Sequence, residues 1–480
     1  MKTKVTIYLL GIALTVITGA YAESPSPSHT GGEAKFSTDE LNRRNIERRA
    51  VEAVIWGMPA VNYERMLQTA IDNGAKLNQV VYWSRPVNEK NQTLTPNPDT
   101  IYFNPFYDTS KGPVVVEIPP ADADHVIVGS FDVAWQNALA DVGPAGEDKG
   151  KGGKYLILPP GYKEEVPDGY FVLQSETYRG FVILRSNFKS RSDADIKSAV
   201  EHGKRIKVYP LGGDPASTVF VDMYDKPFDA TIPYDATFFE HLNKFVQAEP
   251  WLPRDRAMID MLKTIGIEKG KPFNPDAKLK ATLGGAAKEA HDVIALKYEK
   301  SFAMPFFEGA RWALPGSQKA IDGMSSGFAD PNEYAIDGRA VLYHMAYFSM
   351  RHLGGGQFYL LNISDRDGKP LDGSKTYRLK VPAHAPVEQY WSVTAYDRET
   401  HALIRGMSRQ SLGSNDTKVQ NNTDGSVDVY FGPKAPAGKG SNWVPTDPKR
   451  PFELLFRVYG PKKEFFEKVW KLPDVEKVNP

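Results

Sequence analysis

The first regular pattern of apolar positions in the chain is helical and runs from Ser37 to Asn73. Ser37-Thr38-Asp39-Glu40 has the spacing of a capping box, in which a Ser and a Glu three residues apart satisfy each other's backbone donors. Apolar residues then recur three or four positions apart until Gly57 and Pro59, which predict a break in the helix. A second helix is expected over residues 61–71.

Between Val80 and Tyr224 the pattern changes to short apolar runs separated by Pro, Gly and Asp, which is the spacing of a β-sandwich. Strands are expected over 114–118, 125–131, 155–158, 170–173, 181–185 and 206–209, and a helix over 192–203. The polar loop Asn97-Pro98-Asp99-Thr100 precedes an apolar strand over 101–107. A Lys-Gly-Pro turn then predicts that strand 114–118 is its hairpin partner.

Helical spacing returns over residues 234–352 and ends at Gly354-Gly355-Gly356, where three permissive residues stop the helix. The expected helices cover 234–248, 254–265, 276–301 and 337–352. The chain after the glycines returns to a β pattern, and strands over 377–381, 390–396, 427–431 and 452–459 predict a jelly-roll-like sandwich, closed by a short helix over 465–472. The fold class is therefore mostly β with α, in several domains.

The N-terminal residues indicate the compartment of the protein, and the composition argues against some partners. Lys2 and Lys4, an apolar run over 5–20 and the cleavage pattern Ala20-Tyr21-Ala22 predict a signal peptide removed after Ala22, hence a periplasmic or secreted protein. The 480 residues include no Cys, which excludes disulfides and thiolate nucleophiles. The 59 basic and 59 acidic residues balance, so charge gives no reason to expect nucleic acid as a partner. No later segment is apolar enough for stable membrane insertion.

Six motifs, three in each half, together suggest a family. They are Ala53-Val54-Ile55-Trp56-Gly57-Met58-Pro59, Asn97-Pro98-Asp99-Thr100-Ile101-Tyr102 and Gly153-Lys154-Tyr155-Leu156-Ile157-Leu158-Pro159-Pro160-Gly161-Tyr162, then Gln389-Tyr390-Trp391-Ser392-Val393-Thr394-Ala395-Tyr396-Asp397, Asn442-Trp443-Val444-Pro445 and Arg457-Val458-Tyr459. In these the chain resembles a bacterial tandem of two domains of unknown function, numbered 1254 and 1214. The resemblance implies an immunoglobulin-like β-domain, a helical insert and a jelly-roll-like end, and it implies no activity and no residue roles.

The expected division of the chain follows from the patterns and the resemblance together. It comprises a signal peptide (1–22), a disordered lead-in (23–36), a helical front end with an immunoglobulin-like β-domain (37–230), a helical middle domain (231–356) and a jelly-roll-like β-sandwich (357–480).

Two motifs with catalytic or metal-binding spacing lack the context that they need. Gly323-Met324-Ser325-Ser326-Gly327 has the spacing of a nucleophile elbow, but residues 318–322 before it are polar, not a buried strand. His344 and His352 are expected on one helix, roughly 80° apart around its axis, and they are the alternative for a metal site. No third ligand accompanies them at a matching spacing, so we expect no metal and no cofactor.

The candidate catalytic residues lie around the polar loop. Asp99 and Asp132 could act as a general acid and base, with Asn97 and Tyr102 orienting a substrate and Arg185 holding an anion. The competing interpretation is structural: Asp99 caps a turn, Asp132 pairs with Arg185, and the aromatic residues fill the sandwich.

Further candidate ligand-contacting residues are Trp135, Trp391, Asn442, Trp443, Arg457 and Tyr459. Period-two spacing puts Arg457 and Tyr459 on one face of a sheet, where the Arg either stacks structurally or meets a ligand. These residues favour an exported hydrolase-type enzyme acting on a small or envelope-derived substrate. A non-catalytic protein that binds an apolar or carbohydrate ligand, and a structural homo-oligomer, are the open alternatives.

Overall fold

The computed structural model describes residues 36–314, 316–352, 354 and 356–478. The expected signal peptide over 1–22, and the lead-in up to residue 35, lie outside the described residues. By their contacts, residues 1–42 and residues 43–480 form two units, and the packing described below belongs to the second. None of the helices in the described part of the chain is long and apolar enough to cross a membrane.

A single helix, α1 (Thr38–Asp72), takes the place of the two helices expected at the front. The predicted break at Gly57 and Pro59 was wrong because tertiary contacts stabilise the helix through both residues. A Cβ on Gly57 would lie 2.8 Å from Leu242 Cδ1, so the glycine lets α3 (Thr237–Ala248) approach closely. The carbonyl oxygen of Pro59 accepts a hydrogen bond from Gln136 Nε2 at 2.9 Å.

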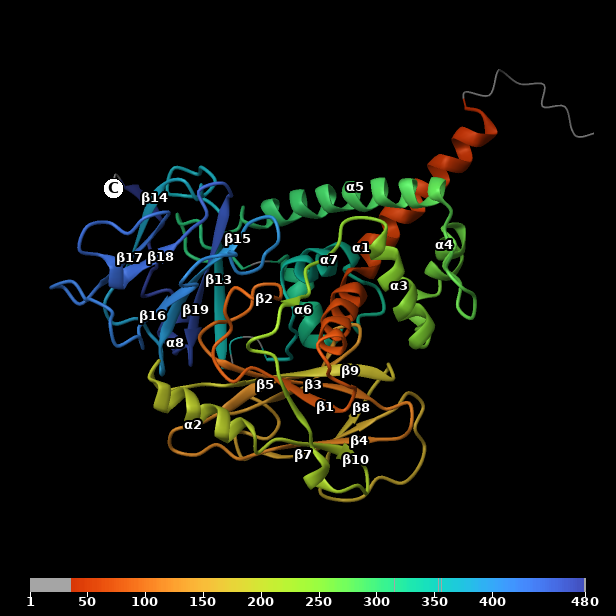
Figure 1. The fold of residues 1–480 in the computed structure, drawn as a ribbon, viewed down its shortest axis with the longest axis horizontal. Helices are drawn as coiled ribbons and strands as arrows, with labels where there is room; N and C mark the ends of the chain where they lie inside the picture. Colours follow the sequence, from red (N-terminus) through yellow and green to blue (C-terminus); the bar gives the residue numbers. More distant parts are fainter. Residues whose placement is uncertain (1–35, 315, 353, 355, 479–480) are drawn as a thin grey trace, which may run out of the picture. The chain divides into compact units, whose positions relative to one another are not determined.

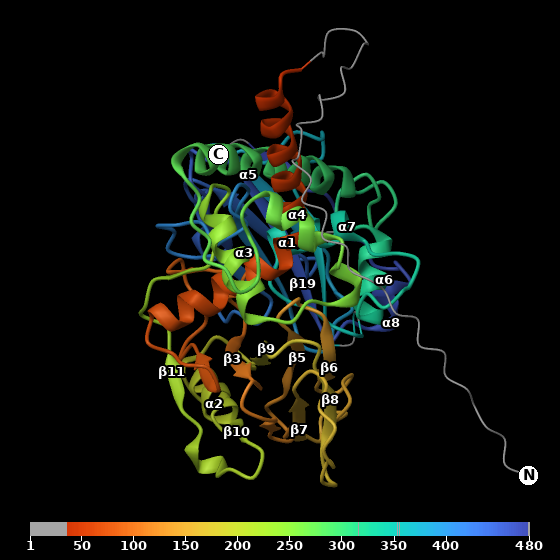
Figure 2. The ribbon, with the colours of Figure 1, turned by 90° about the vertical axis from the view of Figure 1, so that its right-hand side faces the viewer.

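The first β-domain contains two sheets packed face to face, with helices over the outer face of the larger sheet (Figures 1 and 2). The larger sheet has the order β11-β1-β3-β9-β5-β6 and the smaller β10-β4-β7-β8. The strands are β1 (Gln79–Tyr82), β3 (Ile101–Asp108), β4 (Val114–Ile118), β5 (Ile127–Val133), β6 (Ala138–Val142), β7 (Gly153–Leu158), β8 (Phe171–Gln174), β9 (Arg179–Ser186), β10 (Lys207–Pro210) and β11 (Phe220–Asp222). Two short strands, β2 (Asn91–Gln92) and β12 (Phe228–Asp229), pair separately. The strands and the helix α2 (Asp193–Gly203) confirm the sandwich expected from the sequence.

The expected hairpin between strands 101–107 and 114–118 does not form. β3 pairs with β1 and β9 in the larger sheet, whereas β4 pairs with β7 and β10 in the smaller one. Both strands have buried side chains on both faces, so each takes a central place in its own sheet. The Lys-Gly-Pro turn therefore leads the chain from one sheet to the other.

The helices between the two β-regions pack with α1. They are α3, α4 (Met258–Thr264), α5 (Ala277–Ser301), α6 (Gln318–Ser326) and α7 (Ile336–Met345). Residues 323–326 of the Ser325 motif lie inside α6, which is capped by Gly327 with φ of 66°, so the motif is not a nucleophile elbow. The expected helix over 337–352 ends already at Met345, because the chain turns extended at Ala346 and Tyr347 stacks on Phe181 at 4.4 Å between ring centroids.

The C-terminal region forms a second sandwich of two four-stranded sheets, as expected. One sheet has the order β13-β19-β15-β16 and the other β18-β17-β14-β20. The strands are β13 (Gln357–Asn362), β14 (Thr376–Val381), β15 (Trp391–Asp397), β16 (Ser411–Gly413), β17 (Val427–Gly432), β18 (Trp443–Pro445), β19 (Phe452–Tyr459) and β20 (Glu476–Val478). The closing helix α8 (Lys463–Phe466) is shorter and earlier than expected.

The largest apolar core joins these parts. It contains side chains of α1, α3, α5 and α7 together with Phe106 and Ile183 of the first sandwich and Leu361 and Leu455 of the second. β3 and β9 of the larger sheet and β13 and β19 of the second sandwich therefore border one shared interior.

Candidate functional site

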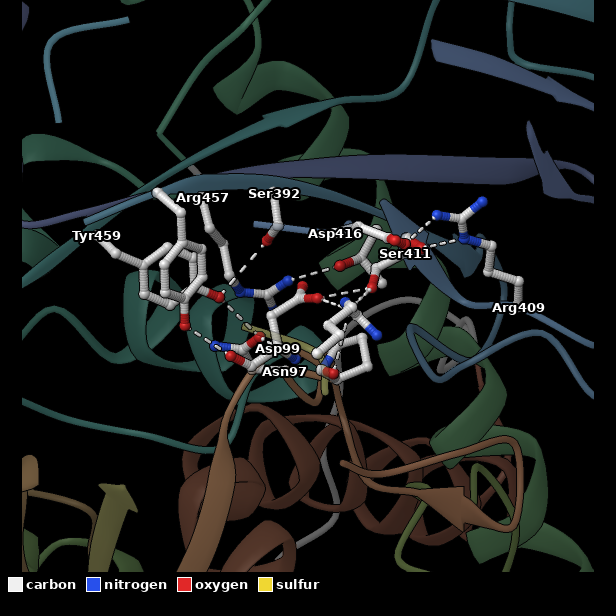
Figure 3. Close-up of polar contacts among 12 residues, drawn as sticks. Asn97, Asp99, Ser392, Arg409, Ser411, Asp416, Arg457 and Tyr459 are labelled. Carbon is white, nitrogen blue, oxygen red and sulfur yellow. Dashed lines mark hydrogen bonds and ion pairs between the residues drawn. The ribbon is translucent and has the colours of Figure 1, made fainter. Parts of the chain in front are cut away.

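Residues 95–99, just before β3, lie against the second sandwich and hydrogen-bond to it repeatedly (Figure 3). The Tyr396 hydroxyl donates to the carbonyl oxygen of Pro96 at 2.6 Å. Arg457 Nη2 donates to the carbonyl oxygen of Thr95 at 3.0 Å, and the Thr95 backbone has a φ of 39°. Side chains of β15 and β19 thus fix an unusual backbone conformation in the loop.

Asn97 connects the loop to both sandwiches. Its Oδ1 accepts hydrogen bonds from the Tyr459 hydroxyl at 2.8 Å and from the backbone N–H of Asp99 at 3.0 Å. Its own backbone N–H donates to the Tyr102 hydroxyl at 3.0 Å. The structure therefore brings together four of the predicted site residues, namely Asn97, Tyr102, Arg457 and Tyr459.

Asp99 belongs to a paired network beside this loop. Its side chain is fully buried, and Oδ1 accepts from Arg191 and from Ser411 Oγ, the latter at 2.8 Å. The Tyr390 hydroxyl donates to its carbonyl oxygen at 2.7 Å. This carboxylate is held by a cation and a hydroxyl.

A cavity of about 40 Å³ lies behind the loop, between the two sandwiches. Its walls are aromatic (Trp83, Tyr102, Tyr347, Phe348, Tyr359), apolar (Met66, Leu94, Pro96, Ile183, Met345, Leu361, Leu455) and polar (Asn91, Thr93, Thr95, Asn97, Asn104, Arg185, Arg457). These described lining residues include no Asp, Glu, His or Ser. The cavity thus offers cations, amides and phenols but no carboxylate or imidazole.

Each sandwich contributes one Arg and one neighbouring Tyr to the cavity. Arg185 on β9 is in register with Tyr102 on β3, and its guanidinium lies 5.4 Å from the centre of that ring. Arg457 on β19 is in register with Tyr359 on β13, at 5.5 Å from its ring centre. Residues in register share one face of a sheet, so each Arg lies beside its Tyr. Both pairs line the cavity, and their positive charges therefore face the same space.

No carboxylate in the described part of the chain pairs with either guanidinium. Arg457 donates to neutral acceptors, namely Thr394 Oγ1 at 2.9 Å, Tyr396 OH at 2.6 Å and the Thr95 carbonyl. Burial raises the pKa of Tyr359, and it raises the pKa of Tyr396 to about 12, so both phenols stay neutral at neutral pH. Two positive charges therefore stay uncompensated in a buried site, because a guanidinium keeps its proton in proteins.

Several polar atoms at the cavity wall have no hydrogen-bond partner. They include the donors Asn97 Nδ2 and Arg185 Nε, the hydroxyls of Thr93 and Tyr347, and the acceptor Asn104 Oδ1. A buried polar group without a partner costs about 1–3 kcal/mol, so a ligand that supplies the missing partners would offset that cost.

Asp132 lies on β5 and interacts electrostatically with Arg185, but it does not line the cavity. Both carboxyl oxygens are buried without a hydrogen-bond partner. Burial raises the pKa of Asp132 well above its usual range, and Asp141 raises it further while Arg185 lowers it. No hydrogen bond or ion pair joins Asp132 to Asp99 in the described chain.

The remaining predicted ligand-contacting residues lie elsewhere. Trp135 packs against Trp56 at 4.9 Å, and Trp391 stacks on Phe456 at 5.6 Å inside the second sandwich. Asn442 holds a loop by donating to the carbonyl oxygen of Gln420 at 2.8 Å. Trp443 Nε1 donates to the carbonyl oxygen of Gly432 at 2.9 Å. All four make packing or backbone contacts.

The prediction that one helix carries His344 and His352 was wrong, because α7 ends before His352. The His344 ring packs on His401, with ring centroids 4.5 Å apart. His352 Nδ1 lies 3.0 Å from Asp141 Oδ2.

Sequence reasoning missed Tyr359, Tyr347 and Asn104. Tyr359 and Arg457 become neighbours only through the register of β13 on β19, which one sequence does not reveal. Asn104 follows Tyr102 by two positions in β3, so period-two spacing from Tyr102 could have indicated that it shares the same face.

Two families match the chain in tandem. Residues 77–210 match a family described as "Protein of unknown function (DUF1254)", and residues 356–463 match one described as "Protein of unknown function (DUF1214)". Together these matches contain Asn97, Arg185 and Arg457. No curated protein matches the chain.

Similarity to two solved structures extends over most of the chain. The VPA0106 protein from Vibrio parahaemolyticus is 21% identical, with a TM-score of 0.57, over 91% of this chain and 100% of its own. An uncharacterised protein from Burkholderia cenocepacia is 12% identical, with a TM-score of 0.40, over 92% of this chain and 96% of its own. The first likeness supports the fold and assigns no activity.

Proposed function

We propose that this chain, which belongs to the tandem family of the unknown-function domains 1254 and 1214, binds a small organic anion between its two β-sandwiches. The observation that carries the proposal is the pair of buried guanidiniums, Arg185 and Arg457, which no carboxylate among the described residues neutralises. Removing an ion from water costs several kcal/mol, and an anionic ligand between the two guanidiniums offsets that cost.

The remaining groups at the wall favour an organic acid with a short body. Guanidinium groups bind carboxylate and phosphate oxygens through paired N–H donors, and Asn97 Nδ2 is a further donor without a partner. Aromatic rings, among them Trp83 and Phe348, offer apolar contact to the body of the ligand.

Cavity volume limits the size of that body. A buried water needs roughly 10–15 Å³, so the volume of about 40 Å³ accepts an acid group but not a large molecule. Met66 and Met345 form part of the wall and have flexible side chains, so they can move to admit a few more atoms.

Matched acids and amides test this proposal. Thermal unfolding at constant ionic strength would compare acetate, butyrate and benzoate each with the corresponding amide. Inorganic phosphate would be tested as a further anion. At least one anion should raise the unfolding temperature while its neutral analogue does not, because a ligand bound only by the folded state stabilises it. Equal shifts from acid and amide, or no shift from any anion, would contradict charge recognition.

A hydrolase is the second proposal, and the state of Asp132 favours it. Burial raises the pKa of this carboxyl, which favours the protonated form that a general acid needs, while Arg185 lowers the pKa. It must move to reach a ligand because it does not line the cavity. Ester analogues of the stabilising acid should then be cleaved by the wild type and not by Asp132→Asn; esters recovered intact from the wild type would exclude this activity.

Export is proposed from the sequence alone. Lys2, Lys4 and the Ala20-Tyr21-Ala22 pattern support cleavage after Ala22. The protein recovered from a bacterial periplasmic fraction should begin at Glu23, whereas an intact Met1 in that protein would contradict cleavage.

A further inference from the structure

A cluster of two imidazoles and one carboxylate lies outside the cavity. Asp122 and His125 belong to the loop between β4 and β5, and His202 belongs to the last turn of α2. One ligand atom from each residue lies within 4.8 Å of the others. Among the described residues this is the one group of three or more that could hold a metal ion.

The spacing of the three side chains is close to that of a metal site. Zinc–nitrogen distances of about 2.0–2.1 Å put neighbouring tetrahedral ligands roughly 3.3 Å apart. Asp122 Oδ1 lies 2.8 Å from His125 Nδ1, and Asp122 Oδ2 lies 3.4 Å from His202 Nδ1. The two imidazole rings are nearly parallel, with centroids 5.0 Å apart, and the Nδ1 atom of each lies near the same carboxylate.

His125 is oriented by a second contact of the kind that metal-ligating imidazoles make. Its Nε2 lies 2.8 Å from Ser198 Oγ on α2. A hydroxyl both donates and accepts, so Ser198 can accept a hydrogen bond from Nε2–H when a metal ion replaces the proton that Nδ1 donates to Asp122 Oδ1.

His202 supplies an independent indication. Its side chain is only 2% exposed, yet Nε2 has no partner and Nδ1 has two distant neighbours, Asp122 and Arg205, each at 3.4 Å. A buried imidazole that points at a carboxylate without a good hydrogen bond is better satisfied by an ion between them. The Asp122 side chain is 46% exposed, which leaves open positions for water or another ligand.

We infer that Asp122, His125 and His202 form a binding site for a divalent transition metal ion, with zinc the ion that fits best. Imidazole nitrogens with one carboxylate suit zinc and its neighbours in the first transition row more than calcium or magnesium. The end of α2 adds partial negative charge from its carbonyl groups, which also favours a cation. The site is separate from the anion cavity, since none of the three residues lines it.

Asp122→Asn is the decisive variant. Asp122 Oδ1 accepts the backbone N–H of Asp124 at 3.0 Å and of His125 at 2.8 Å, and an Asn side-chain oxygen can keep this turn. The substitution therefore removes the charged ligand without removing the loop structure. It avoids the buried His202, whose replacement risks the fold.

The test titrates zinc, and cobalt as a spectroscopic substitute, into the untagged full chain after chelator treatment. One ion should bind per chain, and Asp122→Asn should weaken binding at least about 100-fold. His291→Gln is the matched control, because His291 Nδ1 contacts Asp292 at 3.4 Å in the same manner without a second imidazole. No zinc binding by the wild type, unchanged binding by Asp122→Asn, or an equal loss in His291→Gln would each overturn the site.

Arg205→Gln sharpens the test. Arg205 Nη1 lies 3.4 Å from His202 Nδ1, so its charge repels a metal ion there. Removing that charge should tighten zinc binding, and a weaker affinity would contradict the assigned ligand atom.

Discussion

Two groups of buried charges lie side by side at the junction of the sandwiches and differ in one respect. Asp99 forms an ion pair with Arg191. It also accepts a hydrogen bond from Ser411 on β16, which joins the first β-domain to the second sandwich (Figure 3). Arg185 and Arg457 lie in the neighbouring cavity, and no carboxylate of the described chain pairs with either. Pairing of a buried charge stabilises the fold, whereas an unpaired charge is a cost that a ligand can offset. The first group therefore has the properties of a structural link and the second those of a binding site.

The largest expected effect comes from breaking the paired group. Asp99→Asn preserves shape but removes the negative charge beside Arg191, so the free energy of unfolding should fall by about 3 kcal/mol. Urea unfolding of both proteins measures the difference. Asp225→Asn is the control, since its contact with Lys90 at 3.6 Å is exposed and should contribute less than about 1 kcal/mol. Equal losses in the two variants would show that Asp99 is not a structural link.

Removing a charge from the unpaired group should not lower the free energy of unfolding. Arg185→Met removes a buried cation that pairs with no carboxylate among the described residues. In the absence of ligand, the free energy of unfolding should therefore stay unchanged or rise by about 1 kcal/mol. Affinity for the anion found by the acid–amide comparison should fall about 100-fold, as expected for a lost buried charge contact. A clear loss of stability in the absence of ligand would mean that Arg185 acts structurally.

The smallest effect is expected at the hydroxyl of Tyr459, between the two groups. Tyr459→Phe removes one hydrogen bond to Asn97 Oδ1, of length 2.8 Å, and should lower the free energy of unfolding by about 1 kcal/mol. Tyr162→Phe serves as the control, because its hydroxyl lies 3.5 Å from Glu164 at the surface. A loss as large as that of Asp99→Asn would place Tyr459 in the structural link.

Local sequence patterns predicted most of the strands and helices. Runs such as 114–118 and 452–459 were found because their apolar side chains and turn residues are contiguous in the chain. The hairpin between 101–107 and 114–118 was predicted incorrectly because strand pairing depends on neighbours distant in sequence. The uninterrupted helix α1 was missed for the same reason, since Leu242 and Gln136 stabilise it through Gly57 and Pro59.

The candidate site was predictable only in part. Asn97 and Tyr102 share one motif, and Arg457 and Tyr459 share another, but no local pattern indicates that the two motifs meet. Tyr359 joins Arg457 through strand register, and the cluster of Asp122, His125 and His202 combines a loop with a helix far along the chain. The role of Arg185 as an anion clamp remains a prediction, and its position in the cavity supports it.

Isothermal titration of the stabilising anion would show whether Arg185 forms part of the anion site. It would compare the wild type with Arg185→Met and with Arg409→Met, a matched substitution that breaks the paired contact of Arg409 with Asp416 at 2.6 Å. Arg185→Met should bind the anion about 100-fold more weakly than the wild type, whereas Arg409→Met should keep the wild-type affinity even if it is less stable. Unchanged affinity in Arg185→Met, or an equal loss in both variants, would contradict an anion site built on unpaired buried arginines.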